Sequence, residues 1–433
     1  MRALSFKALV VVPMMAILVA VACGTGSSSN KGTVHVIAVW SGQEQANFMA
    51  VLKPFTDQTG IKVDYESTRD EDAILTSRVG AGNPPELAAA PSPQLLTTFA
   101  KQGKVIALND AVDMSALSST TAKSWIDLGE PLGDGKLYQI FSWAAVKGLI
   151  WYNPKNFQAK GYSVPNSWDS LINLQGQIKG SGTTPWCVTV ESGSASGWPA
   201  SDWLKEIVLS QSGPAVYDKW VAGTQKWTSP EIKQAWQTFG QILGSGASNV
   251  YGGSKYAIST NFGDVGTPMF ANPPKCYMLN QASFITTFFT SAKPGLQAGT
   301  DFNFFPMPDV SQQFAGAHVV AGDSWSMFKD TPQARQLINY LTTAQAQSIW
   351  VKLGGKLAVN KQVSIDDYPD VLSKQSAQII VNTQIAKYDA TDNMPADMRA
   401  AVWKELLNFI QNQNNLDAIL GRLDAVQATA YKS

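Results

Sequence analysis

The sequence predicts an α/β fold that is divided into two domains. Two observations support this: the length of the chain and the order of its strand-like and helix-like segments. The chain has 433 residues, and a single hydrophobic core usually stops growing at roughly 250–300 residues. Strand and helix patterns alternate, which is typical of a parallel sheet with crossover helices. Apolar residues make up 45% of the chain, enough to fill a core in each domain.

The first β-α-β unit lies at residues 34–65. Val34–Val39 is a short run rich in β-branched residues, so we expect a strand there. The apolar positions of the helix that follows are Phe48, Val51, Leu52 and Phe55. Pro54 is expected to kink this helix or to mark its last turn, and Gly60 is expected to stop it. Residues 61–65 alternate apolar and polar side chains, which predicts a second strand.

Later segments continue the alternation of strands and helices. Further strands are expected at Ile140–Trp151, Cys187–Val190 and Cys276–Asn280. Further helices are expected at Leu95–Ala100, after Pro165, at Trp203–Leu209, after Pro332, and over Val402–Ile410 and Leu416–Val426. The strongest helix start is Asp330-Thr331-Pro332, because proline is well suited to the first helical position.

Residues 1–22 are predicted to be a signal peptide rather than part of the fold. Arg2 and Lys7 give a positive start, and the apolar run Ala8–Ala22 is shorter than the ~20 residues that a membrane span needs. Cys23 and a Gly/Ser-rich linker through residue 33 follow. A signal core that ends in Ala-Cys resembles a bacterial lipoprotein signal. This implies that Cys23 is lipidated and anchors residues 23–33 to the outer face of the cell membrane.

An ordinary secretion signal with a chance cysteine is the alternative. The sequence has Ala20 where the lipoprotein signal usually has Leu. Both interpretations predict an exported protein, which is either membrane-anchored or periplasmic. Loss of the signal would remove two basic residues and leave a slightly acidic chain.

Export bears on the other cysteines. The chain has three cysteines, and lipidation of Cys23 leaves Cys187 and Cys276 in an oxidising compartment. Two cysteines there usually form a disulfide, so we expect this bridge. Two buried free thiols are the alternative. A catalytic cysteine is not expected, because neither histidine lies in a recognisable partner motif.

Composition and missing motifs narrow the function. The 33 basic and 33 acidic residues balance, so no basic field is available to hold nucleic acid. Two histidines exclude most His-ligated metal sites, and no metal or cofactor is expected. Phosphate-loop and dinucleotide motifs are absent from the sequence. The segment Gly193–Gly197 has Ala195 where a nucleophile elbow needs serine. These features argue against an enzyme, although any two carboxylates could still meet in space as in glycosidases.

A set of ordered motifs resembles a known family. Its marks are Phe55–Val63, Gly82–Glu86, Gly135–Tyr138, Trp151–Pro154, Pro165–Trp168, Thr184–Cys187, Gly197–Trp203, Pro274–Tyr277 and Met394-Pro395. In order and spacing they resemble the extracellular solute-binding lipoproteins of ABC transporters (family 1), and most closely the α-glucoside-type proteins. Glu86 and Phe141 depart from the usual Asp and Pro of that family, which leaves local loop detail open.

The resemblance implies the type II periplasmic-binding-protein-like fold, with two α/β lobes around a hinge and a ligand cleft. It places an N-terminal lobe at 34–143 and 304–341 and a C-terminal lobe at 144–303 and 342–433, with crossings near Ala144, Phe304 and Leu341. It also implies a monomer that captures a sugar, such as an α-glucoside or oligosaccharide, and delivers it to the permease subunits by hinge closure. A non-sugar solute on the same scaffold and an exported glycan-cleaving enzyme are the alternatives.

Candidate ligand residues follow from the chemistry of sugars. Aromatic plates cover the apolar C–H face of a sugar ring, and charged or amide groups pair with its hydroxyls. Loops at the carboxyl ends of strands and family positions give the candidates Trp40, Gln43, Glu44, Arg69, Asp70, Gln94, Trp143, Glu191, Ser192, Trp198, Gln281, Phe284, Asp323, Trp325 and Trp403. The alternatives are core packing for Trp40, Trp143 and Trp403 and a surface turn for Arg69-Asp70.

Overall fold

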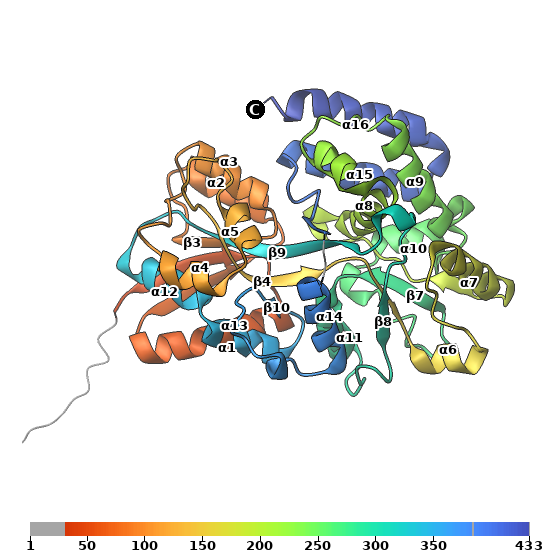
Figure 1. Ribbon diagram of the computed structural model, residues 1–433, viewed down its shortest axis with the longest axis horizontal. Coiled ribbons are helices and arrows are strands. Elements are labelled where there is room, and N and C mark those ends of the chain that lie inside the picture. The colour runs from red at the N-terminus through yellow and green to blue at the C-terminus, as the bar shows by residue number, and fades with distance from the viewer. Residues whose placement is uncertain (1–30, 383–384, 433) are drawn as a thin grey trace, which may run out of the picture.

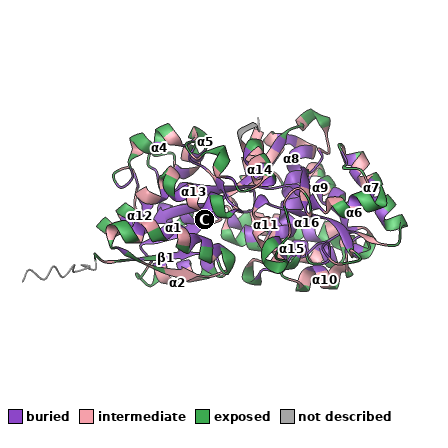
Figure 2. Cartoon of the chain, turned by 90° about the horizontal axis from the view of Figure 1, so that it is seen from below, coloured by how far each residue is buried: buried purple, intermediate pink, exposed green. Residues whose placement is uncertain are grey.

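The computed structural model describes residues 31–382 and 385–432, so the predicted signal peptide and Cys23 lie outside the described residues. The chain folds into two α/β lobes that lie side by side (Figure 1). Buried residues run through the middle of each lobe and exposed residues lie at its periphery (Figure 2). None of the helices within the described ranges is both long enough and apolar enough to cross a membrane.

The first lobe is built on a seven-stranded sheet. Its strands are β10 (Leu357–Ala358), β4 (Ile140–Val146), β9 (Ala317–Met327), β3 (Leu87–Ala90), β1 (Thr33–Ala38) and β2 (Lys62–Ser67) in spatial order, with β11 (Ile385–Tyr388) paired to β9. Its helices are α1 (Gln43–Thr59), α2 (Glu71–Gly80), α3 (Pro93–Lys101), α4 (Met114–Thr120), α5 (Lys123–Gly129), α12 (Pro332–Thr342) and α13 (Ala344–Leu353). Strands β1, β2 and β3 are parallel, so their carboxyl ends meet at one edge.

The second lobe is built on a four-stranded sheet. Its strands are β6 (Thr184–Trp186), β7 (Cys276–Gln281), β5 (Leu149–Tyr152) and β8 (Asn303–Pro306) in spatial order. Its helices are α6 (Pro154–Lys160), α7 (Trp168–Gly180), α8 (Trp198–Val221), α9 (Pro230–Leu243), α10 (Gly253–Ser259), α11 (Thr286–Ala292), α15 (Ala396–Gln411) and α16 (Leu416–Ala430). Helix α14 (Val371–Asn382) lies between the lobes in the view of Figure 1.

The first predicted β-α-β unit is confirmed as β1, α1 and β2. Helix α1 continues beyond Pro54 to Thr59 and ends at Gly60, which adopts the left-handed conformation. The strand predicted at Cys187–Val190 is wrong, since β6 ends at Trp186. The expected disulfide is present: Cys187 and Cys276 are bonded, and the bridge ties the segment after β6 to the start of β7.

The sheets also bear on the predicted lobe boundaries. The boundary at 304 falls inside β8, which pairs with β5 in the second sheet. The boundary at 341 precedes α13, whose Ala346 and Trp350 pack in the core of the first lobe. Both differences arise because pairing partners far away in the sequence decide which lobe a segment joins.

The hinge is formed where strands pass between the lobes. The apolar run predicted as one strand at 140–151 is broken at Lys147-Gly148 into β4 and β5, which belong to different sheets. Strand β9 contributes Val319 to the core of the second lobe and Trp325 to that of the first. Glu206 of α8 contacts both segments that connect the lobes. Its Oε1 accepts a hydrogen bond from the Val319 amide of β9 at 3.1 Å, and its side chain faces Gly148 between β4 and β5.

Gly148 should tolerate no side chain. Its φ is +63°, and a Cβ would lie 2.4 Å from Cδ and Oε1 of Glu206, which is buried and held by Val319. Gly161 is a matched control, because its φ is +67° and a Cβ there would meet nothing within 4 Å. We expect Gly161→Ala to lower the free energy of unfolding by about 1 kcal/mol and Gly148→Ala by a further ~1–3 kcal/mol. Urea unfolding measures both, and equal losses would contradict the close contact.

Glu206 should make stability depend on pH. Burial raises its pKa to about 8, with Asp202 adding to the rise and the Val319 amide opposing it. Because the pKa in the unfolded chain is about 4.3, the folded protein retains a proton between these values, and the free energy of unfolding falls as pH rises through that window. Glu206→Gln cannot ionise, so from pH 5 to 8 it should gain stability relative to wild type, on the order of 1.4 kcal/mol per pH unit. Urea unfolding at several pH values tests this, and a constant offset would contradict it.

Candidate ligand-binding site

A cavity of about 330 Å³ lies between the two lobes. The first lobe supplies residues that follow β1, β2 and β3, together with Asp323 of β9 and Lys356. The second lobe supplies the start of α8, the segment after β11 and one face of α15. The cavity therefore sits at the carboxyl ends of the parallel strands, where ligands bind in open α/β sheets. Its size is near the lower end of the roughly 300–1,000 Å³ range of small-molecule pockets.

The first-lobe wall contains a buried lysine held by two carboxylates. Nζ of Lys356 lies 3.0 Å from Oδ2 of Asp323 and 3.5 Å from Oε1 of Glu44. The same Asp323 oxygen accepts a hydrogen bond from Nε1 of Trp40 at 3.2 Å. Burial lowers the pKa of Lys356, but Asp323 and Glu44 reverse this and hold it above its ordinary value. The lysine is therefore charged and has partners within the wall.

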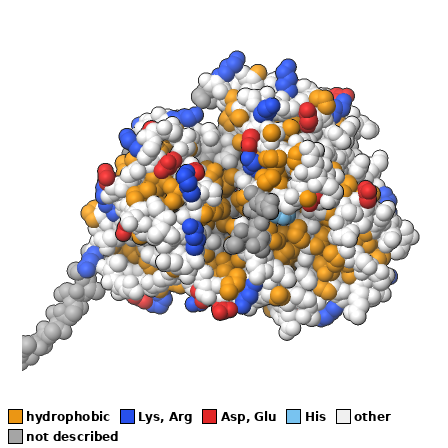
Figure 3. Space-filling view, viewed as in Figure 1, with side chains coloured by type: hydrophobic (Ala, Val, Ile, Leu, Met, Phe, Trp, Pro, Cys, Tyr) orange, Lys and Arg blue, Asp and Glu red, His pale blue; other side chains and the backbone are white. Residues whose placement is uncertain are grey.

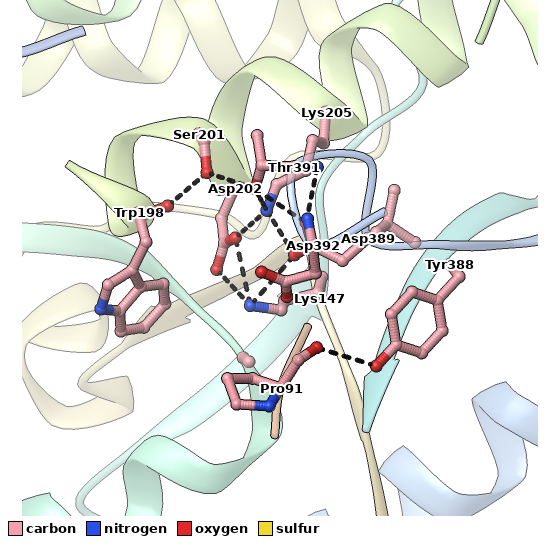
Figure 4. Close-up of polar contacts among 12 residues, drawn as sticks. Pro91, Lys147, Trp198, Ser201, Asp202, Lys205, Tyr388, Asp389, Thr391 and Asp392 are labelled. Carbon is pink, nitrogen blue, oxygen red and sulfur yellow. Dashed lines mark hydrogen bonds and ion pairs between the residues drawn. The ribbon is translucent and has the colours of Figure 1, made fainter. Parts of the chain in front are cut away.

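The second-lobe wall contains two more buried lysines (Figure 4). Nζ of Lys147 lies 2.9 Å from Asp202 and 3.5 Å from Asp389, and Nζ of Lys205 lies 2.7 Å from Asp202 and contacts Asp389. The side chains of all four are 6% exposed or less. Two lysines and two aspartates thus share their charges out of contact with bulk water, where an unpaired ion would be very costly.

The charges around the cavity nearly cancel. Its carboxyl groups belong to Glu44, Asp70, Glu71, Asp72, Asp323, Asp389 and Asp392, and its cations to Arg69, Lys147, Lys205, Lys356 and Arg399. Burial raises the pKa of Glu71 and of Asp392, and the neighbouring Asp72 and Asp389 respectively raise them further. Both shifts favour the neutral acid, which lowers the negative charge of a wall that, with Asp202 included, holds eight carboxyl groups and five cations. The cavity is therefore suited to a neutral ligand.

Aromatic side chains form the apolar part of the cavity. The ring of Trp198 packs 5.1 Å from Phe262 and 6.1 Å from Phe284, between ring centroids. Nζ of Lys147 lies 4.8 Å from the Trp198 centroid, within cation–π range. Trp403 on α15 also lines the cavity. These rings give the cavity flat apolar faces beside its polar groups.

Several contacts join the lobes around the cavity. The guanidinium of Arg69, which follows β2, lies 5.3 Å from the ring of Phe262 in the second lobe. Oγ of Ser92, the N-cap of α3, donates a hydrogen bond to the carbonyl oxygen of Asp392 at 2.8 Å. Arg399 of α15 contacts the carboxylate of Asp72 on α2. The two lobes thus contact each other around the cavity, and both contribute to its lining.

Comparison with known proteins decides the family. Residues 40–348 match the family described as bacterial extracellular solute-binding protein. The chain belongs to this family. This confirms the family and the fold inferred from the sequence motifs.

Two curated relatives and one solved structure extend the comparison. An osmoprotective compounds-binding protein, GgtB of Synechocystis sp., is 34% identical, over 89% of this chain and 90% of the relative. An alpha-glucosides-binding periplasmic protein, AglE of Rhizobium meliloti, is 34% identical, over 90% and 86%. The solved bacterial solute receptor AcbH has a TM-score of 0.81 at 20% identity and covers 92% of this chain and 99% of its own, which shows a shared fold.

The solute-binding fold brings many of the predicted ligand residues together. Those that line the cavity are Trp40, Glu44, Arg69, Asp70, Ser192, Trp198, Phe284, Asp323 and Trp403. Those placed elsewhere are Gln43, Gln94, Trp143, Glu191, Gln281 and Trp325. Trp143 and Trp325 are buried in the first core, where β4 and β9 direct them away from the cavity. Gln94 lines a separate hollow beside α8 and α16, and Gln43 is exposed.

The remaining two misplaced residues lie close to the site but use their polar groups locally. The carboxylate of Glu191 accepts hydrogen bonds from the Gly193 amide at 2.7 Å and from Nδ2 of Asn261 at 2.9 Å. The side-chain oxygen of Gln281, at the end of β7, accepts one from the Ala282 amide at 3.2 Å. Of the 14 tryptophans, only Trp198 and Trp403 are more than 9% exposed, so most of the tryptophan content serves packing.

Several charged residues that line the cavity were not among the ligand residues predicted from the sequence. Lys147, Lys205, Asp389 and Asp392 line the cavity but were not predicted, and neither were Lys356, Glu71 and Arg399. Lys147 directly follows β4, so the strand-end rule could have found it. Asp389 directly follows β11 in the same way. The others are positioned by segments whose proximity depends on tertiary folding, and no local pattern marks them.

Removal of Lys205 should be strongly destabilising. It would leave Asp202 and Asp389 with Lys147 as their shared cation, and breaking a buried pair costs roughly 3–5 kcal/mol. We expect Lys205→Met to lower the free energy of unfolding by this amount, and the double variant with Asp389→Asn to recover part of it. Lys123→Met is the matched control, because Lys123 pairs with Asp127 on the exposed surface; we expect little change there. Urea unfolding at pH 7 checks all three, and equal effects for Lys205 and Lys123 would contradict the buried pairing.

Proposed function

We propose that this solute-binding protein captures a small sugar, an α-glucoside or short oligosaccharide, and delivers it to the permease of an ABC importer. The observation that carries the proposal is the cavity between the lobes, in which three buried lysines are paired with carboxylates and the apolar faces are aromatic. A neutral, hydroxyl-rich ligand needs this combination of flat apolar surface and a few fixed polar groups.

Paired charges favour a neutral solute over an ion. Lys147, Lys205 and Lys356 each contact at least two carboxylates. A free anion would have to compete with those carboxylates for the lysines. A free cation would be repelled by the positive charge of the lysines. Hydroxyl groups can instead add hydrogen bonds to ions that stay paired. The name of AglE, an alpha-glucosides-binding protein with 34% identity, supports the same class of ligand.

Closure of the hinge would couple capture to transport. Only the closed arrangement lets a ligand contact Arg69 and Asp323 in one lobe and Trp198 in the other. A ligand that binds the closed form more tightly shifts the open–closed equilibrium towards it. The permease would then recognise the closed form. No covalent step is part of this proposal.

The predicted tether completes the proposal. A lipid on Cys23, followed by the Gly/Ser-rich linker, would hold a monomer close to the membrane-embedded permease. Metabolic labelling with a lipid analogue, compared between the natural chain and Cys23→Ala, tests this part separately. Labelling that is equal in both chains would argue for ordinary secretion.

A polyol or glycosylated polyol is a second candidate. The cavity is small, and GgtB, with 34% identity, is named for osmoprotective compounds. Such solutes share neutral hydroxyl chemistry with sugars, so the same polar groups would serve them.

Calorimetry with a panel of solutes tests the proposal. The panel contains methyl α-glucoside, maltose, trehalose, sucrose, glycerol and an acidic and a basic amino acid, and we expect binding within the sugars. Trp198→Ala should weaken binding roughly tenfold because the aromatic plate is lost, whereas Trp198→Phe should retain most of the affinity. Glycerol binding without sugar binding would favour the second candidate. Binding of neither, or release of glucose from any glucoside, would count against both.

A further inference from the structure

Three buried polar atoms on the cavity wall have no protein partner. Within the described part of the chain, Oε1 of Glu71, Nη1 of Arg399 and Nε1 of Trp403 make no hydrogen bond. Glu71 is 3% exposed and Arg399 is 2% exposed, and all three residues line the cavity between the lobes. Buried polar groups are nearly always paired, because an unpaired group costs roughly 1–3 kcal/mol. Their occurrence on one cavity indicates a partner that enters it.

The three residues form one corner of the cavity. Glu71 and Asp72 are the first two residues of α2, and three residues separate them from the end of β2. Arg399 and Trp403 lie one turn apart on α15 of the opposite lobe. Arg399 contacts Asp72 across the lobes, and its guanidinium lies 5.5 Å from the ring of Trp403. The Arg399–Asp72 pair thus holds Nη2 of the guanidinium, whereas Nη1 is buried without a protein partner.

The chemistry of the corner matches hydroxyl groups. Nη1 of Arg399 and Nε1 of Trp403 are donors only, and the Glu71 carboxyl supplies an acceptor. Burial, with Asp72 adding, raises the pKa of Glu71 well above its ordinary range, so the neutral acid can also donate. A single hydroxyl that accepts from a donor and donates to Glu71 uses two of these atoms. Two adjacent hydroxyls use all three.

We infer that Glu71, Arg399 and Trp403 form a subsite that binds a vicinal pair of hydroxyl groups at one end of the ligand. This inference rests on the proposed function, since it assigns part of that same site. The subsite spans both lobes, so a bound diol would connect α2 to α15 beside the Arg399–Asp72 pair. It would select ligands by the position of their hydroxyls.

Other unpaired atoms in the protein are a useful contrast. Nε1 of Trp236 also has no partner, but Trp236 packs inside the core of the second lobe and does not line the cavity. Trp236→Phe therefore controls for the loss of an indole N–H without a subsite. Arg422→Lys is the matched control for Arg399, because Arg422 pairs with Glu405 and does not line the cavity.

The test combines conservative variants with deoxy sugars in calorimetry. The probes are methyl α-glucoside and maltose, each with its monodeoxy analogues. We expect Glu71→Gln and Arg399→Lys to weaken binding by roughly 10- to 100-fold and Trp403→Phe by roughly 3- to 10-fold, with Trp236→Phe and Arg422→Lys within twofold of wild type. Removal of either of two adjacent hydroxyls should weaken binding to wild type. The same removal should matter less in Glu71→Gln and Arg399→Lys, because the partner is already lost.

A variant of Asp72 tests whether Arg399 acts through closure of the lobes rather than through a diol subsite. Binding of the probes by the wild-type protein shows whether the sugar proposal itself holds. Asp72→Ala removes the contact between the lobes but leaves the three unpaired atoms in place. If it reproduces the deoxy-sugar profile of Arg399→Lys, Arg399 acts through closure and the subsite is wrong. If wild type binds a probe and all three variants bind it equally well, the subsite fails while the proposed function stands. If wild type binds neither probe, the α-glucoside proposal fails and the subsite with it.

Discussion

The pairing of buried charges at the boundary between the lobes is the constraint on which the site depends. Lys147 and Lys205 share Asp202 and Asp389, and each of these groups is nearly inaccessible to water. An unpaired ion in such a place costs several kcal/mol, so the segments that carry these residues have to stay in register. Those segments are the end of β4, the start of α8 and the end of β11, which are far apart in the sequence. The charges therefore fix one wall of the cavity as a rigid surface.

The hinge is compatible with that rigidity because it lies beside the cluster. Lys147 is followed directly by Gly148, where the chain leaves the first sheet for the second. Strand β9 is shared between the two cores and provides a second connection. Glu206 supports both, through the Val319 amide and through its contact with Gly148. The two connections thus share one supporting side chain, while each lobe keeps its own core.

The same pairing shapes what the cavity can recognise. Since the three buried lysines are paired with carboxylates, the groups left for a ligand include the aromatic faces around Trp198 and the unpaired atoms at the α2–α15 corner. Charged side chains on the surface are scattered over the face shown in Figure 3 rather than gathered into one patch. Both observations agree with a protein whose ligand is small and neutral and whose selectivity comes from geometry.

Local pattern in the sequence was sufficient for much of the fold. A run of β-branched residues marked β1, the helical spacing of apolar residues marked α1, and alternation marked β2. The strand-end rule placed Trp40, Glu44, Arg69 and Asp70 at the cavity, whereas Asp323 lines it from within β9. The cysteine count in an exported chain predicted the disulfide. These features depend on periodicity, on the polarity of parallel strands and on the redox compartment, all of which are properties of short segments or of composition. The direction of Trp143 and Trp325 was not accessible in this way, because the partner strand decides which face of a strand is buried. The break at Gly148, the charge cluster and the corner of Glu71 and Arg399 were decided only by tertiary structure, because each depends on contacts between segments that are far apart in the sequence.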